Sequence, residues 1–314
     1  MAHFAFVFPG QGAQAIGMLD GFAGNAAVEQ TVAEANEALG FDLGRLIATG
    51  PKEEQDLTTN TQPIMLTAAV AVYRAWIAAG GPAPALVAGH SVGEYAALVA
   101  AGVLAFKDAV PLVRFRAQVM QEAVPVGQGG MAVILGLTAE QVRAVCAQAA
   151  ADSASVVEAV NFNEPTQIVI AGYNAGVERA CALAKEQGAK RALKLAVSAP
   201  FHSSLLNSAS DRLRDYMQDI AFAAPQIALI NNVDVAILND PAAIKDALVR
   251  QAAGPVRWVE TMQQFAASGI TQVIECAPSK VLIGMAKRID PRLAGESLGD
   301  QAALERVLST INQA

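Results

Sequence analysis

The sequence has few residues of the kinds that bind metals or form disulfides. Its 314 residues include only three cysteines and three histidines. Cys146, Cys181 and Cys276 lie far apart and show no CxxC or Cys/His spacing. This distribution argues against a disulfide framework and against a zinc site, so we expect no bound metal.

Charged and aromatic residues are also scarce. Charged residues make up 16% and aromatic residues 5% of the chain, whereas hydrophobic residues make up 53%. A composition rich in small aliphatic side chains excludes a disordered or fibrous chain and suits buried parallel strands packed against helices. The net charge of −7, with no long basic run to offset it, argues against nucleic acid as a partner.

No hydrophobic run in the sequence is long enough to cross a membrane. Polar residues and glycines interrupt the apolar stretch 84–106, and Arg74 interrupts the stretch 64–79. Neither offers the ~20 continuous apolar residues that a spanning helix needs. The first residues lack the basic segment of a secretion signal, and Pro9-Gly10 would break its apolar core. We therefore expect a soluble, cytoplasmic protein with no membrane partner.

Strand and helix patterns divide the chain into two α/β regions around a middle region of different character. A Pro/Gly-rich segment, 124–130, marks the change. The middle region then reads strand, helix, strand, strand, helix, strand, which is the ferredoxin-like arrangement. We predict an α/β protein with a large hydrolase-like domain (1–126 and 199–314) around a central, mainly parallel sheet. A small ferredoxin-like domain (127–198) is inserted in it.

The predicted elements follow the hydrophobic periodicity of the chain. In the large domain we expect strands at 3–8, 85–88, 227–231 and 272–276, and helices at 26–39, 63–79, 93–101, 107–123, 242–252 and 257–267, with a further helix ending near 220. In the small domain we expect strands at 131–136, 156–161, 167–171 and 191–197, and helices at 139–150 and 175–187.

Ser91 occupies the centre of Gly89-His90-Ser91-Val92-Gly93, between a predicted strand and a predicted helix. The sharp turn of such a nucleophile elbow exposes the serine Oγ, and its glycines let neighbouring backbone pass close by. The N-terminal N–H groups of the following helix stabilise negative charge at the serine. The alternative is a plain glycine turn with a capping serine, but the flanking strand and helix favour a nucleophile.

A nucleophilic serine needs a base, and the chain offers three histidines. His90 neighbours Ser91 on a turn where consecutive side chains diverge, and His3 begins the first predicted strand. His202 follows the rigid segment Ala199-Pro200-Phe201 and is therefore the expected base. No acidic residue stands out as a third member, and His202 lies far from the C-terminus, so the pair does not look like an ordinary esterase triad.

The segment Phe8-Pro9-Gly10-Gln11-Gly12-Ala13-Gln14 leaves the first predicted strand as a glycine-rich loop. It is not a dinucleotide fingerprint, because a proline opens it and no strand ending in Asp or Glu follows at the required distance. No GK[ST] follows it, so it is not a P-loop either. Two interpretations remain: a loop that presents backbone N–H groups to an oxyanion beside Ser91, or a tight exit from a strand.

Arg116 falls on the apolar stripe of a predicted helix, whereas Arg114 lies about 200° away, towards the polar face. The stripe consists of Leu112, Val113, Phe115, Val119 and Met120. A guanidinium on an inward face must meet an anion, because unpaired burial of charge is costly. That anion is either an internal Asp or Glu, or the carboxylate of a substrate held by two N–H groups.

Together these motifs resemble those of the malonyl-CoA:acyl carrier protein transacylase family, in one order over nearly the whole chain. The matching segments are Phe8-Pro9-Gly10-Gln11-Gly12-Ala13-Gln14, Gly89-His90-Ser91-Val92-Gly93-Glu94-Tyr95, Arg114-Phe115-Arg116, Pro200-Phe201-His202-Ser203, Gln251 before Pro255-Val256-Arg257-Trp258, and Glu275-Cys276-Ala277-Pro278-Ser279-Lys280-Val281-Leu282. One departure is Ala277, where many relatives have glycine, and it lies away from the catalytic positions.

The resemblance implies a role for each matching site residue. It implies that Ser91 is acylated, that His202 is its general base and acid, and that Arg116 holds the free carboxylate of the malonyl group. It also implies that the backbone N–H groups of Gln11 and Val92 form the oxyanion hole.

Two further implied roles concern the base and the acyl group. The main-chain carbonyl at Gln251 would orient His202 in place of the carboxylate of a hydrolase triad. Our hypothesis is that such a neutral orienter does not strongly raise the pKa of His202 and limits the activation of water against the acyl-serine. Phe201, directly before the histidine, is the residue found in malonyl-selective members, and it would crowd an α-methyl branch.

The implied reaction is a ping-pong transfer without a cofactor. The malonyl group passes from malonyl-CoA to Ser91 and then to the phosphopantetheine thiol of acyl carrier protein, which supplies fatty acid synthesis. A discrete acyltransferase serving a polyketide synthase would share every one of these residues. A serine thioesterase or esterase and a non-enzymatic carrier-protein-binding module are less favoured. We expect the protein to act as a monomer.

Carrier proteins are acidic, as is this chain, so docking needs a local basic patch. Lys190, Arg191 and Lys194, at the last predicted strand of the small domain, form the best candidate. A solvated strand edge explains the same residues equally well.

Overall fold

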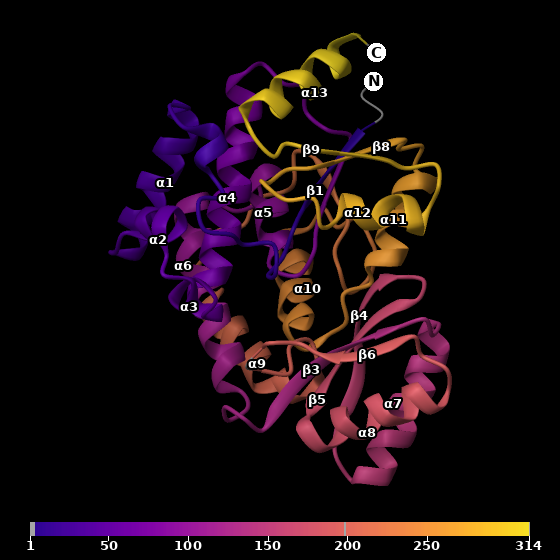
Figure 1. Cartoon of the computed structure of the whole chain (residues 1–314). Helices are drawn as coiled ribbons and strands as arrows, with labels where there is room; N and C mark the ends of the chain where they lie inside the picture. Colours follow the sequence, from indigo (N-terminus) through magenta and orange to yellow (C-terminus); the bar gives the residue numbers. More distant parts are fainter. Residues whose placement is uncertain (1–3, 198, 314) are drawn as a thin grey trace.

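The computed structural model describes residues 4–197 and 199–313. Its strands form two sheets, which lie in different parts of the molecule (Figure 1). The larger sheet has the strand order β7-β2-β1-β8-β9, and its strand pairings are parallel. Its strands are β1 (Phe4–Phe8), β2 (Leu86–Gly89), β7 (Ala228–Leu229), β8 (Gln272–Glu275) and β9 (Ala294–Ser297).

Helices from both halves of the chain surround this sheet. They are α1 (Ala26–Leu39), α2 (Leu43–Thr49), α3 (Lys52–Gln55), α4 (Thr58–Ala78), α5 (Gly93–Ala100), α6 (Phe106–Glu122), α9 (Asn207–Tyr216), α10 (Pro241–Ala253), α11 (Trp258–Ala267), α12 (Ile283–Ile289) and α13 (Gln301–Gln313), with 3-10 turns η1 (Asp20–Phe22) and η2 (Ser204–Leu206). In the described part of the chain, no helix combines the length and the apolarity needed to cross a membrane.

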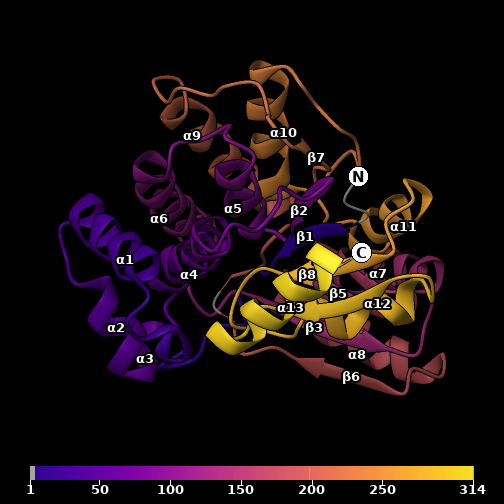
Figure 2. The same cartoon turned by 90° about the horizontal axis from the view of Figure 1, so that it is seen from above.

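The central strand β1 is buried on both faces of the sheet. Its three phenylalanines belong to one hydrophobic cluster, together with Trp76 of α4, and Ala5 and Val7 belong to another with residues of α11 and α12. This alternation follows from the two-residue side-chain period of a strand. Figure 2 shows α4 and α11 on opposite sides of β1 and β8.

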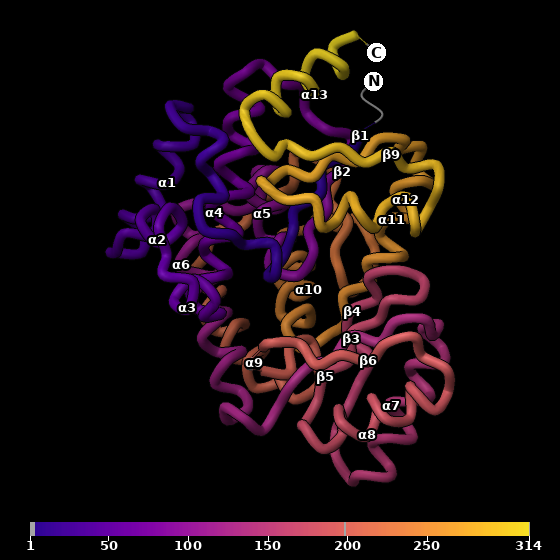
Figure 3. Tube along the Cα trace, viewed as in Figure 1, coloured from indigo at the N-terminus to yellow at the C-terminus, as the bar shows by residue number. Residues whose placement is uncertain are grey.

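The second sheet is antiparallel and carries its own pair of helices. Its order is β4-β5-β3-β6, and Figure 3 shows it with its helices at the lower end of the molecule. The elements are β3 (Gly129–Leu135), α7 (Ala139–Ser153), β4 (Val157–Glu164), β5 (Gln167–Tyr173), α8 (Asn174–Glu186) and β6 (Arg191–Lys194). This βαββαβ unit is ferredoxin-like, and the predicted α/β architecture is confirmed.

The smaller sheet packs tightly onto the rest of the chain. One of its faces contributes to a cluster with α7 and α8, whereas Met131 and Val169 on the other face join the cluster of the larger sheet. The backbone of β4 also hydrogen-bonds Val256, through Val160 O at 2.9 Å and Phe162 N at 3.0 Å. We propose that 127–198 is an inserted domain, as the sequence predicts; its last residue, Ser198, lies outside the described residues.

Most predicted elements are present with small shifts of their ends, and four points differ. Helix α4 begins at Thr58 rather than at Pro63, so Pro63 lies inside the helix, in its second turn, where it has no N–H to donate to a preceding carbonyl. Strand β6 ends at Lys194 and not at Val197. The elements α2, α3, α12, β9 and α13 were not predicted. His3, expected to begin the first strand, lies outside the described residues.

Candidate active site

Ser91 lies at a sharp turn between β2 and α5. Its backbone has a φ of 54°, which is unusual for a residue other than glycine. The chain folds back so tightly that a Cβ on Gly89 would lie 1.9 Å from the carbonyl carbon of Gly93. The predicted strand–turn–helix around Ser91 is therefore present, and it points the serine side chain away from its neighbours.

The glycine-rich loop after β1 packs directly against this turn. A Cβ on Gly93 would lie 2.1 Å from the carbonyl oxygen of Phe8, and a Cβ on Gly10 would lie 2.6 Å from that of His90. Among the described residues, the backbone N–H groups of Gln11 and Val92 donate to no protein acceptor. Both residues line the cavity around Ser91, which is the arrangement that an oxyanion hole requires.

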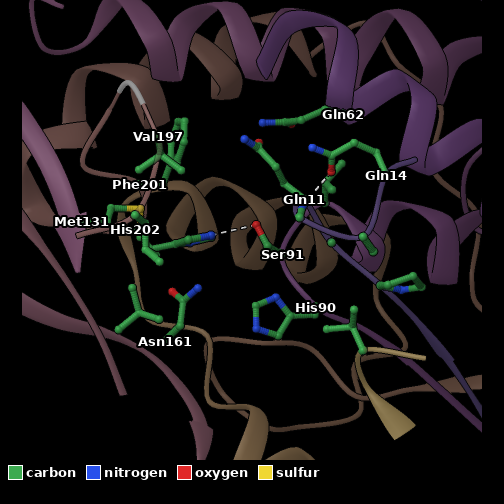
Figure 4. A pocket seen from close by; sticks show the side chains of 18 of the residues that line it. Gln11, Gln14, Gln62, His90, Ser91, Met131, Asn161, Val197, Phe201 and His202 are labelled. Carbon is green, nitrogen blue, oxygen red and sulfur yellow. Dashed lines mark hydrogen bonds between the residues drawn. The ribbon is translucent and has the colours of Figure 1, made fainter. Parts of the chain in front are cut away.

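His202 approaches Ser91 from the segment that follows β6. Its Nε2 lies 2.7 Å from Ser91 Oγ, and Figure 4 shows the imidazole pointing at the serine oxygen. Its Nδ1–H donates to the carbonyl oxygens of Gln251 (3.0 Å) and Gly254 (3.1 Å). These contacts fix the tautomer, so that Nε2 is the nitrogen that accepts the serine proton.

The electrostatic surroundings keep the His202 imidazole neutral. Burial and then the positive charge of Arg116 lower its pKa from 6.5 to about 3, although the hydrogen bonds to the carbonyls of Gln251 and Gly254 act in the opposite direction. A histidine with this pKa is uncharged near pH 7 and is able to accept a proton.

His90 contacts Asn163, whereas a base for Ser91 would have to contact the serine hydroxyl. Its Nε2 lies 2.8 Å from Asn163 Oδ1, and its ring packs at 5.5 Å from that of Trp258. Sequence reasoning placed His90 outside the reacting pair, and its contacts agree with that.

Arg116 of α6 is buried, with 1% of its surface exposed. Its guanidinium donates to Gln62 Oε1 (2.7 Å), to Gln251 Oε1 (2.9 Å) and to Ser91 Oγ (3.2 Å). Within residues 4–197 and 199–313, no Asp or Glu forms an ion pair with it, and its buried Nε–H has no partner. The internal salt bridge that the sequence left open is therefore not formed, and the guanidinium is available to an anion that enters the cavity.

A cavity of about 420 Å³ connects these groups. The turn at Ser91 and the loop 9–14 form one side, and Met131 and Val169 of the smaller sheet form another, together with the segment 195–197 that follows β6. Phe201 lines the cavity next to His202 and is 7% exposed. The walls of the cavity therefore come from residues in or next to both sheets.

Comparisons with known proteins show the family of the chain. The family model described as "Acyl transferase domain" matches residues 5–291. The malonyl CoA-acyl carrier protein transacylase of Salmonella typhimurium is 50% identical over 310 residues, which cover 98% of this chain and 100% of that relative. The chain belongs to the malonyl-CoA:acyl carrier protein transacylase family.

Solved structures of related proteins share the whole fold of this transacylase. The acyl-carrier-protein S-malonyltransferase of Burkholderia pseudomallei is 65% identical, with a TM-score of 0.96 over 98% of this chain and 99% of that one. The chain also matches a structure described as a type II PKS acyl-carrier protein in complex with its malonyl-transacylase. That match is 48% identical, with a TM-score of 0.96 over 98% of this chain and 99% of the other.

Several polar residues of the transacylase site were not found by sequence reasoning. They are Gln62, Glu94, Asn232 and the side-chain amide of Gln251. Glu94 and Asn232 are each 1% exposed, and Asn232 Oδ1 accepts a hydrogen bond from Ser91 N at 2.8 Å. Burial raises the pKa of Glu94 to about 7, against the hydrogen bonds that it accepts. The clue in the sequence was a carboxyl group on the apolar helix directly after the Ser91 turn.

Of the basic residues suggested for docking, Arg191 and Lys194 lie on the edge strand β6 and Lys190 directly precedes it; none of them lines the cavity. Lys190 and Arg191 are exposed, whereas Lys194 Nζ lies 2.6 Å from Glu178 Oε1. Lys194 is therefore partly neutralised by an acid of its own unit. Among the described residues of the transacylase, no group of three or more His, Cys, Asp and Glu is arranged to hold a metal ion.

Proposed function

We propose that this transacylase moves the malonyl group from malonyl-CoA to the phosphopantetheine thiol of acyl carrier protein through a malonyl-Ser91 intermediate. The contact that carries this proposal is the 2.7 Å pair of Ser91 Oγ and His202 Nε2, beside the buried guanidinium of Arg116, which forms no ion pair among the described residues. A serine and its base give acyl transfer, and the free cation selects an acyl group with its own negative charge.

In the first half-reaction, malonyl-CoA enters with its free carboxylate on Arg116. Ser91 Oγ attacks the thioester carbonyl carbon while its proton passes to His202 Nε2. The negative oxygen of the tetrahedral intermediate accepts hydrogen bonds from the N–H groups of Gln11 and Val92. The bond from carbon to sulfur then breaks, and His202 returns the proton to the coenzyme A sulfur.

In the second half-reaction, the thiol of the carrier protein follows the reverse path. His202 takes the thiol proton, and the sulfur attacks the acyl-serine carbonyl. The intermediate collapses, the bond from carbon to Ser91 Oγ breaks, and His202 returns the proton to Ser91. Every group is regenerated without a cofactor.

The partners of His202 support transfer over hydrolysis. Its Nδ1–H is held by two neutral carbonyl groups, of Gln251 and Gly254, and not by a carboxylate. A carboxylate would stabilise the imidazolium and raise the pKa of His202, which would favour activation of water. A neutral orienter fixes the ring without that effect.

Phe201 sets the acyl selectivity in this proposal. It is buried in the cavity wall beside the base, where a ring would contact an α-methyl branch on the malonyl group. Docking of the carrier protein uses the exposed Lys190 and Arg191, with a smaller contribution from Lys194. In this proposal the transacylase acts in the cytoplasm as a monomer and supplies fatty acid synthesis.

The experiment that tests the proposal is intact-mass measurement of the protein with malonyl-CoA. The wild type should gain ~86 Da, the mass of a malonyl group in the covalent mechanism, and peptide mapping should place it on Ser91. The Ser91→Ala variant should gain nothing. Added carrier protein should remove the adduct faster than water does; hydrolysis at the rate of transfer would instead indicate a thioesterase.

A second function is supported by one specific similarity, the match to a malonyl-transacylase solved with a type II PKS acyl-carrier protein. Supply of a polyketide synthase uses the same chemistry and the same residues. Transfer rates to a fatty acid and to a polyketide carrier protein, measured side by side, decide between the two pathways.

A further inference from the structure

Glu94 is a buried acid of the site that takes no part in the proposed proton transfers. It lies on the first turn of α5, and among the described residues it forms no ion pair. Its Oε2 accepts hydrogen bonds from Gln251 Nε2 (2.8 Å) and Asn232 N (3.1 Å). Because burying a carboxyl group without a cation is costly, these two contacts define what the residue does.

The side-chain amide of Gln251 joins Glu94 to the reacting groups. It is fully buried; its Nε2 also donates to Ser91 O at 2.9 Å, and its Oε1 accepts from Arg116 Nη2 at 2.9 Å. The donor end of the amide thus faces acceptors, and its acceptor end faces a donor. A rotation of the amide by 180° would bring donor against donor at Arg116 and acceptor against acceptor at Glu94.

We infer that Glu94 is a positioning residue whose carboxyl oxygen holds the Gln251 amide with its oxygen toward Arg116, so that the guanidinium is fixed in place for the malonyl carboxylate. This inference rests on the role proposed for Arg116.

The amide between the carboxyl group of Glu94 and the guanidinium of Arg116 has a clear physical advantage. A carboxylate in direct contact with Arg116 would occupy the N–H groups that the substrate needs. The amide instead presents its positive end to Glu94 and its negative end to Arg116, so the guanidinium is held while its Nε–H stays unpaired among the described residues.

Two variants of Glu94 test the inference. Glu94→Met keeps the length of the side chain and removes the acceptor, whereas Glu94→Gln keeps an oxygen that accepts from both N–H groups. Glu94→Met should lower the ratio of malonyl to acetyl transfer by roughly tenfold, the effect of one hydrogen bond to a charged partner. The loss should appear mainly as a higher KM for malonyl-CoA. Glu94→Gln should stay within about threefold of the wild type.

A double-mutant cycle shows whether Glu94 acts through Arg116. In an Arg116→Ala background, Glu94→Met should cause no further fall in the malonyl-to-acetyl ratio, because the group that it positions is already gone. If the two losses multiply, Glu94 acts independently and the inference is wrong. It is equally wrong if Glu94→Gln loses the malonyl preference as strongly as Glu94→Met.

Two further measurements keep the outcomes apart. Thermal unfolding of each variant distinguishes a loss of fold from a loss of selectivity. If Glu94→Met does not fold, Gln251→Met, which removes the amide that Glu94 holds, must show the same fall in the ratio of malonyl to acetyl transfer. The malonyl adduct on wild-type Ser91 is measured first. Without that adduct the proposed function fails; with it, an unchanged ratio in Glu94→Met refutes only the positioning role.

Discussion

Replacing Arg116 by alanine should abolish the preference for malonyl over acetyl groups. The guanidinium is proposed to donate two hydrogen bonds to the malonyl carboxylate, and hydrogen bonds to charged groups contribute about 1.5–3 kcal/mol each. At the lower end the two together contribute about 3 kcal/mol, so kcat/KM for malonyl-CoA should fall roughly 10²-fold. Acetyl-CoA has no such carboxylate, and its transfer should change by less than about threefold.

The stability of this variant should change little, because two effects oppose each other. Gln62 Oε1 and Gln251 Oε1 each lose a donor, at about 1 kcal/mol apiece. Removal of this buried cation, which forms no ion pair among the described residues, also removes the free-energy cost of its desolvation. Differential scanning calorimetry of the variant and the wild type checks that the stability is unchanged before the kinetics are interpreted.

Steady-state kinetics with malonyl-CoA and acetyl-CoA, at a fixed concentration of carrier protein, measure the effect. Arg114→Ala is the matched control, since it removes the same side chain from the same helix. Arg114 packs over the ring of Phe41 at 4.5 Å and does not line the cavity. Equal losses with both acyl-CoA substrates would show that Arg116 is structural and would refute the reasoning.

Three other results are expected. Burial lowers the pKa of His202 to about 3, so kcat/KM should stay constant as the pH falls through 6.5, the ordinary pKa of a histidine. The charge of Arg116 also lowers the pKa of His202, so in Arg116→Ala the acidic decline of kcat/KM for acetyl-CoA should move to higher pH. Phe201→Ser should raise activity with methylmalonyl-CoA by roughly tenfold, because a hydrophobic pocket usually discriminates against one methyl group by about that factor. An unchanged ratio of methylmalonyl to malonyl transfer would show that Phe201 does not set the selectivity. Lys190→Glu combined with Arg191→Glu should raise the KM for carrier protein several-fold at low salt but not the KM for malonyl-CoA; if neither KM changes, the carrier protein docks elsewhere.

The parts of the site that local patterns encode were predictable. The strand, turn and helix around Ser91 are adjacent in sequence, so its geometry follows from a few residues. Arg116 was placed inward by helical periodicity alone, and it is 1% exposed. His202 was reached by elimination, because the chain contains so few histidines.

The parts that depend on distant contacts were not predictable from patterns. Glu94 meets Gln251 across 157 residues of sequence, and Arg116 meets Gln62 across 54. No local period reports which polar side chains converge from such distances. The resemblance supplied the carbonyl of Gln251 but not its amide, which makes more of the contacts in the site.

The C-terminal elements were missed for a different reason. Strand β9 is a short segment, Ala294–Ser297, at the edge of the sheet, with exposed residues at its start. It therefore lacks the continuous apolar run that reveals the buried strand β1. The predicted helix at 63–79 is too short because proline usually stands in the first turn of a helix, whereas Pro63 lies inside α4, five residues after its start at Thr58.

The backbone at the reacting pair has a consequence for how this protein would respond to selection. Ser91 and His202 both have left-handed backbone, with φ values of 54° and 65°, a conformation that costs roughly 1–2 kcal/mol for each residue other than glycine. The fold therefore carries strain at the two positions where chemistry occurs. A library screened for heat resistance alone would tend to place glycine or asparagine at 91 and 202. Such a screen would yield variants that are more stable to heat but inactive, unless catalytic activity were measured together with stability.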